Sequence, residues 1–261
     1  MPFLERVTAG RGIPRELLEE VSHHYLALGG VSRINEQNRE LQAHLLEELE
    51  RRKIDIPLYL GNRNSQPFFA DILRKIHGDG HRRILSVVTS AYTSYSGCRQ
   101  YRENLFQALV DADLEGQITI DKVRHYFDHP GFVHPFANGL VGALKTLSEE
   151  GFTPASTHIF FTTHSVPISM AQTSGPQSMR ETFPDGLYVA THNEAATAIL
   201  GIASKQSNYP LPAWSLLYLS RSGAPHIPLL EPDLGVALRH SAPAGIDSCG
   251  VVHIEFVRDH C

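Results

Sequence analysis

The chain has 261 residues, 42% of them hydrophobic and 20% charged, so it is long enough for one large domain or two smaller ones. Its formal net charge of -5 argues against a nucleic-acid-binding protein, because binding to phosphates depends on clustered positive charge. The three cysteines (Cys98, Cys249 and Cys261) are far apart and odd in number, which indicates a reducing compartment without a disulfide framework. No apolar run approaches the length of about 18 residues that a membrane span needs, and no signal-peptide core is present. We therefore expect a cytoplasmic protein without a transmembrane segment.

The first part of the chain is predicted to be helical. Pro14 suits the first turn of a helix, and the amphipathic segment 15–28 follows it before Gly29 and Gly30. A second helix is expected over residues 34–52, where leucines and an isoleucine recur on one face.

Beyond residue 55, short apolar runs alternate with helical patterns. We expect strands at 56–61, 82–90, 117–123, 157–163, 213–220 and 251–257. We expect helices at 66–77, 98–112, 131–150, 190–204 and 231–240. Continuous apolar strands that alternate with helices are typical of an α/β fold, in which helices cover parallel sheets. In such sheets the ligand site lies beyond the carboxyl ends of the strands.

His164 directly follows the apolar run 157–163, so it falls at the carboxyl end of a predicted strand, and Pro167 then resists helix continuation. Neutral imidazole is a good ligand for divalent metals of the iron class. Its ordinary pKa of about 6.5 also lets it take up a proton near neutral pH. A hydrogen-bonded structural histidine could occupy the same place, so position alone leaves both interpretations open.

Three other segments carry candidate binding residues, two of them after predicted strands and one, GGVS, between two predicted helices. Segment 90–101 (SAYTSYSGCRQY) combines hydroxyl and aromatic groups that suit a flat ligand with anionic groups, although a βα turn with N-cap residues has the same composition. Ser32, in GGVS, and Arg63, in GNRNSQP, could each hold a carboxylate. Ser32 is explained equally well by one helix ending and the next beginning there. Arg63 is explained equally well as a surface arginine.

Several familiar motifs for metal binding, nucleotide binding and hydrolysis are absent, or lie in a segment with the wrong predicted structure. The histidines of HYFDH (125–129) have the spacing of a zinc-binding helix, but Pro130 follows them and the segment is predicted to be a loop. The sequence has no GxGxxG, no GxxxxGK[ST] and no GxSxG, so nucleotide binding and α/β-hydrolase chemistry are unsupported.

Taken together, these segments resemble the ferrochelatase family, specifically the actinobacterial type that inserts iron into coproporphyrin III. The resemblance rests on PFLERVTAGRGIPRELLEEV, HYLALGGVSRIN, LYLGNRN, VTSAYTSYSGCRQYREN, HYFDHPGFV, FFTTHSVP, SRSGAPHIPLLEPD and FVRDH, in the family's order. It implies an α/β fold with two similar Rossmann-like lobes, each with a parallel sheet flanked by helices, and a porphyrin cleft between them. The lobes are expected at 1–127 and 128–261. The family's opening strand would precede Met1 and its last elements would follow Cys261, so we expect a chain truncated at both ends.

The resemblance also implies roles for individual residues. His164 matches the histidine that coordinates iron and takes part in porphyrin deprotonation. Ser32 and Tyr101 match positions that contact coproporphyrin, and Arg63 matches one near the substrate carboxylates. The implied partners are Fe(II) and coproporphyrin III, with no organic cofactor, and the implied state is a monomer.

Cys98 stands where some relatives place one ligand of a [2Fe-2S] cluster. The other three ligands come from a C-terminal extension that would lie beyond Cys261. We therefore do not expect a complete cluster in this chain.

The chain departs from the family pattern at several positions. The acidic residue of the family's DHxE motif would follow Cys261 directly. Arg33, Leu219 and Leu229 replace a proline, a glutamine and a tryptophan, whereas His253 and Glu255 replace the proline and glycine of PxGF. These changes leave two alternatives open, namely a chelatase for another metal or tetrapyrrole and a non-catalytic porphyrin-binding remnant.

Overall fold

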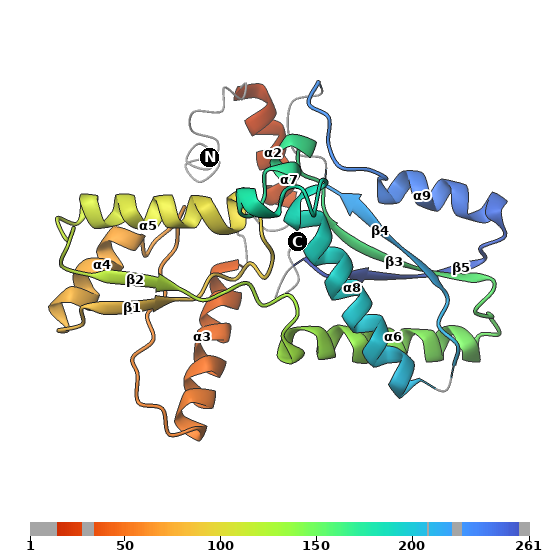
Figure 1. Ribbon diagram of the computed structural model, residues 1–261, viewed down its shortest axis with the longest axis horizontal. Helices are drawn as coiled ribbons and strands as arrows, with labels where there is room; N and C mark the ends of the chain where they lie inside the picture. Colours follow the sequence, from red (N-terminus) through yellow and green to blue (C-terminus); the bar gives the residue numbers. More distant parts are fainter. Residues whose placement is uncertain (1–14, 28–33, 208, 221–225, 256–261) are drawn as a thin grey trace. The chain divides into compact units, whose positions relative to one another are not determined.

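The computed structural model describes residues 15–27, 34–207, 209–220 and 226–255 (Figure 1). The chain divides into two compact units. Unit 1 contains the residues up to Ser86 together with Arg102–Asp121, and unit 2 contains Val87–Tyr101 and the described residues from Lys122 onward. Each unit combines a sheet with helices, so the expected α/β class is confirmed. The expected lobe boundary between residues 127 and 128 stays a prediction.

Unit 1 is built around a two-stranded sheet of β1 (Arg83–Ser86) and β2 (Thr119–Lys122). Its helices are α2 (Arg15–Ala27), α3 (Ile34–Arg51), α4 (Phe69–Gly78) and most of α5 (Gln100–Asp111). Apolar side chains of α4 and α5 pack with Leu114 and Ile118 in a small core. These helices lie close to their predicted ranges.

The strand predicted at 56–61 does not form. This segment has no regular secondary structure, and the nearest pairing is a single bridge between Asn62 and Phe68. An extended apolar segment becomes a strand only when a neighbouring strand accepts its backbone hydrogen bonds. Within the described residues this segment has no such neighbour, and Ile56 is 54% exposed.

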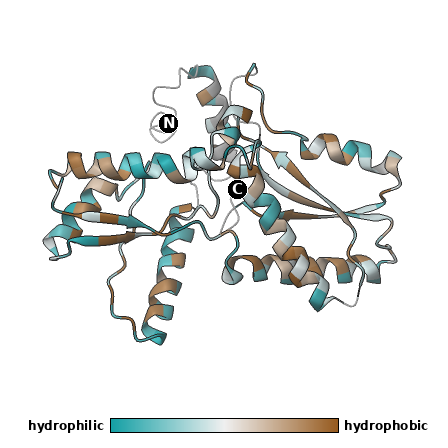
Figure 2. Cartoon of the chain, viewed as in Figure 1, coloured by the Kyte–Doolittle hydropathy of each residue, from teal (hydrophilic) through white to brown (hydrophobic). Residues whose placement is uncertain are grey.

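Helix α3 carries both hydrophobic and hydrophilic residues (Figure 2), yet none of its eighteen residues is buried. Ile34, Leu45 and Leu46 remain exposed on it. The predicted apolar face is therefore present in the sequence but is not covered by the described residues.

Unit 2 has a three-stranded sheet in the order β4-β3-β5, formed by β3 (Thr157–His164), β4 (Ala213–Leu219) and β5 (Ser248–His253). Both outer strands run parallel to β3. Six of the eight residues of β3 are buried, as its continuous apolar sequence predicts for a central strand. Four helices accompany this sheet: α6 (Pro130–Glu149), α7 (Ile168–Gln172), α8 (Gly186–Gln206) and α9 (Leu234–Ser241).

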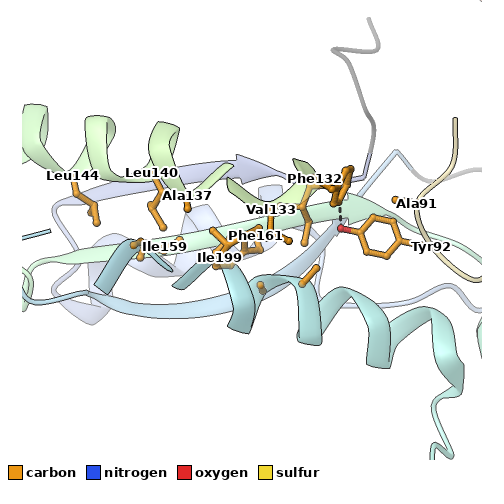
Figure 3. Close-up of a cluster of buried hydrophobic side chains, with 14 residues drawn as sticks. Ala91, Tyr92, Phe132, Val133, Ala137, Leu140, Leu144, Ile159, Phe161 and Ile199 are labelled. Carbon is orange, nitrogen blue, oxygen red and sulfur yellow. Dashed lines mark hydrogen bonds between the residues drawn. The ribbon is translucent and has the colours of Figure 1, made fainter. Parts of the chain in front are cut away.

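The main core of unit 2 lies where α6 and α8 pack against β3 (Figure 3). Leu140 and Leu144 of α6 meet Ile159 and Phe161 of β3, and Ile199 of α8 completes the contact. Helix α6 begins at Pro130 because the His129 side chain accepts a hydrogen bond from the Gly131 backbone at 3.1 Å. The HYFDH segment is thus a loop, as predicted, and not a zinc-binding helix, and its last residue caps α6.

A five-residue π-helix, Tyr95–Arg99, precedes α5 and was not predicted. The Ser94 hydroxyl caps it by accepting a hydrogen bond from the Gly97 backbone at 2.8 Å. A Cβ at position 97 would collide with the Ser90 hydroxyl, so the close turn requires glycine. Ser94 therefore acts as the N-cap residue that the composition of segment 90–101 indicated.

Two glycines of α8 allow a matched test of how closely the start of this helix packs against α7. Gly186 has a φ of +86°, and a Cβ there would collide with the Ala171 carbonyl, whereas Gly201 faces open space within the helix. Gly186→Ala should lower the free energy of unfolding by more than about 2 kcal/mol through strain and collision. Gly201→Ala should raise it by about 0.5–1 kcal/mol, because alanine favours helix. Urea denaturation measures both changes, and equal stabilities for the two variants would contradict this arrangement.

Candidate functional site

The carboxyl ends of β3 and β5 lie together because the two strands pair in parallel. The register joins Thr157 to Ser248 and continues to Thr162 opposite His253. The Ile254 backbone then donates to the Thr162 carbonyl at 3.1 Å, so the pairing persists past the end of β5. Two further steps of the same register place position 255 beside position 164.

His164 is the last residue of β3 and pairs with Leu219 of β4. Its side chain is 34% exposed, so the ring is accessible while its backbone is held in the sheet. The prediction that His164 lies at the carboxyl end of a strand is confirmed. Because side chains alternate along a strand, His164 and Thr163 point to opposite faces of the sheet.

The carboxyl group of Glu255 lies beside this imidazole. Its Oε2 atom lies 3.9 Å from Nδ1 of His164, and its side chain is only 16% exposed. Oε2 is buried and accepts no hydrogen bond from the residues that the structure describes. Burial raises the pKa of the Glu255 carboxyl to about 8, although a hydrogen bond from the His164 backbone acts in the opposite direction.

Helix α8 holds the end of β3 through a buried hydrogen-bond network on the opposite face of the sheet. The Tyr188 hydroxyl donates to the His164 carbonyl at 2.9 Å and lies 3.0 Å from Oγ1 of Thr163. Nδ1 of His192 donates to the Tyr188 carbonyl at 2.7 Å, so the neutral ring accepts from Thr163 at Nε2, over 2.8 Å. Burial lowers the pKa of His192 to about 3, which keeps this ring neutral near pH 7.

Tyr92 extends the same network to the end of β5. Its ring stacks on His192 with centroids 3.6 Å apart and planes 12° apart. Its hydroxyl donates to the Ile254 carbonyl at 2.8 Å (Figure 3). The residues immediately before His164 and Glu255 are therefore both held by buried hydrogen bonds.

The other predicted site residues are distributed over the chain. Tyr101, the second residue of α5, and Cys98, in the π-helix, are both half-buried and belong to unit 2. Arg63 is half-buried in unit 1. Ser32 lies outside the described residues, as do the last residues from 256 to 261. Across the described ranges, no group of three or more histidine, cysteine, aspartate or glutamate side chains is placed to hold a metal ion.

Comparison with known proteins decides the family. The ferrochelatase family model matches residues 1–261, the whole chain. The chain belongs to the ferrochelatase family. A coproporphyrin III ferrochelatase of Streptomyces coelicolor is 49% identical over 262 residues, covering 100% of this chain and 68% of the relative. Relatives of the same name from Streptomyces griseus and Leifsonia xyli are 47% and 45% identical, again covering 100% of this chain and 68% of each relative.

The predicted family is thus confirmed, and with it the class of enzyme, because ferrochelatases are metal chelatases. In the described part of the ferrochelatase chain, no helix has the length and apolar character needed to cross a bilayer.

Sequence analysis alone missed three residues of this site. In the sequence, Glu255 stands out only as a departure from a glycine, and its contact with His164 depends on the strand register. Tyr188 and His192 lie four residues apart on α8, one helical turn, and therefore share a face. That spacing was a usable signal, but it does not indicate which strand the two residues would meet.

The raised pKa of Glu255 predicts a pH-dependent effect on stability. Because the folded protein binds this proton more tightly than the unfolded chain does, the contribution of Glu255 to the free energy of unfolding is greatest below the ordinary glutamate pKa of 4.5 and falls as pH rises towards about 8. In the Glu255→Gln variant the side chain is neutral at every pH, so its contribution to the free energy of unfolding does not fall as pH rises. The stability of the variant relative to the parent should therefore increase by about 3 kcal/mol between about pH 5 and about pH 8.

Urea denaturation at the two pH values measures this difference. Glu194→Gln, which changes an exposed side chain of α8, is the matched control and should follow the parent at both pH values. A Glu255→Gln variant whose relative stability does not change with pH would contradict the burial of this carboxyl group.

Proposed function

We propose that this chain inserts Fe(II) into coproporphyrin III in haem synthesis, with His164 as iron ligand and proton acceptor. The observation that carries the proposal is the accessible imidazole of His164 at the carboxyl end of β3, in a chain whose relatives are named coproporphyrin III ferrochelatases. The reaction releases two protons, because Fe(II) replaces the two N–H protons of the macrocycle.

The chemical difficulty is that a planar macrocycle directs its nitrogen lone pairs inward and keeps two of the nitrogens protonated. An enzyme that binds the macrocycle bent exposes these lone pairs on one face and favours the transition state for insertion. His164 would present Fe(II) to that face through a ring nitrogen. As iron moves to the porphyrin nitrogens, the released imidazole would accept the two N–H protons one after the other and pass each of them to water.

We assign binding of the substrate carboxylates to Ser32, Tyr101 and Arg63. A guanidinium can bind a carboxylate through two parallel hydrogen bonds, and hydroxyl groups can donate to the remaining oxygens. The reaction needs Fe(II) as a substrate and no organic cofactor, and the proposal includes no role for a cluster at Cys98. A monomer in the cytoplasm is part of the same proposal.

One observation favours a second candidate. Glu255 places a carboxyl group beside His164, at the position of the glycine in the family's PxGF pattern. This substitution adds oxygen donor atoms near the proposed metal ion. This change supports a related chelatase with a different metal preference, because oxygen and nitrogen donors rank divalent metals differently.

His164→Ala should lower the rate of iron insertion at least about a hundredfold, because it removes both the ligand and the proton acceptor. Binding of coproporphyrin III should persist, since the imidazole does not hold the carboxylates. Anaerobic incubation with Fe(II) and coproporphyrin III, followed by visible absorbance, measures both properties. His134→Ala, at an exposed position of α6, is the matched control and should retain the parental rate.

The same assay separates the alternatives. Insertion of Co(II) but not Fe(II) by the parent protein would favour the second candidate. A porphyrin band shift without insertion of either metal would identify a binding remnant. Unchanged turnover in His164→Ala would contradict the role assigned to His164.

A further inference from the structure

Glu255 is a costly residue for the fold to bury. Its Oε2 atom is buried and accepts no hydrogen bond within the described parts of the chain, although a buried carboxyl oxygen normally has a partner. The family's PxGF pattern has glycine at this position, so the fold at the end of β5 does not need a carboxyl group. The backbone that precedes Glu255 is already held by Tyr92, through Ile254, and by the pairing of β3 with β5.

The distance from Glu255 to His164 suits a shared ion better than a direct hydrogen bond. The 3.9 Å between Oε2 and Nδ1 is too long for a hydrogen bond. Metal–nitrogen and metal–oxygen bonds are about 2.0–2.2 Å long, so two donor atoms on one ion lie about 3–4 Å apart. An imidazole with a carboxylate is also a common pair of ligands for divalent iron-class metals.

We propose that Glu255 is a second protein ligand for the incoming divalent cation, so that His164 and Glu255 bind the ion together before it enters the porphyrin. This inference rests on the proposed function and adds a ligand that is particular to this chain. The cation would be the partner that the Oε2 atom lacks among the described residues, and it would stabilise the charged carboxylate.

Two protein ligands fit a cation that is a substrate. The ion must leave the protein for the macrocycle, so its other coordination positions have to remain open to water and then to pyrrole nitrogens. A closed site with three or four side chains would retain the ion, and the described residues offer no such group. Two protein ligands can therefore bind the cation and still release it to the porphyrin.

Binding of Co(II) without porphyrin tests this inference independently of turnover. The purified chain is titrated with CoCl2, and the dissociation constant is measured by calorimetry and by the visible bands of bound Co(II). Glu255→Gln, which keeps the shape but removes the charged oxygen ligand, should weaken binding at least about tenfold. His164→Ala should weaken it to a similar extent. Glu194→Gln, on the exposed surface of α8, serves as the matched control and should bind like the parent.

Circular dichroism of each variant confirms folding before titration, and the Gln side chain replaces the ionisable carboxyl group without leaving a cavity. Retention of parental Co(II) affinity by Glu255→Gln would overturn the inference. If insertion is lost in His164→Ala while Glu255→Gln still binds Co(II) like the parent, the proposed function stands and only the second ligand is wrong. If the parent does not insert iron but Glu255→Gln loses Co(II) affinity, the cation-binding pair stands and the proposed function, with the transfer of that cation to porphyrin, fails.

Discussion

The parallel pairing of β3 with β5 is the constraint on which the candidate site depends. Parallel strands bring their carboxyl ends to one edge of the sheet, and the register then determines which residues meet there. In this chain the register carries Glu255 to within 3.9 Å of His164, although 91 residues separate them in sequence. A shift of one residue would turn the carboxyl group to the opposite face.

The two faces of this strand end have different chemistry. On one face, Thr163, Tyr188 and His192 satisfy one another's hydrogen bonds, and His192 stays neutral because it is fully buried. On the other face, His164 is accessible, and one carboxyl oxygen of Glu255 has no hydrogen-bond partner among the described residues. The first face gives rigidity, which a site needs in order to hold its ligands at fixed positions. The second face carries the two groups that we propose to bind the cation and, in the case of His164, to accept protons.

Much of the fold could be predicted from apolar runs and helix signals. The run THIFFTT predicts the buried central strand β3, and His164 follows it at the accessible end. The segment 56–61 also has an apolar strand pattern, but no strand among the described residues pairs with it. The sequence pattern of a segment does not show which segments will lie beside it. For the same reason, the contact between His164 and Glu255 was not predicted, since it follows from the register of two strands far apart in the chain. Family resemblance, in turn, implied a role for His164 and treated Glu255 only as a substitution.

The most direct test of this account is a crystal structure of the chain with bound Co(II), with the ion located by its anomalous scattering. The account predicts an anomalous peak at about 2.0–2.2 Å from a ring nitrogen of His164 and from a carboxylate oxygen of Glu255. A peak bound to His164 alone, or to side chains elsewhere, would contradict the claim that the paired ends of β3 and β5 form the cation site.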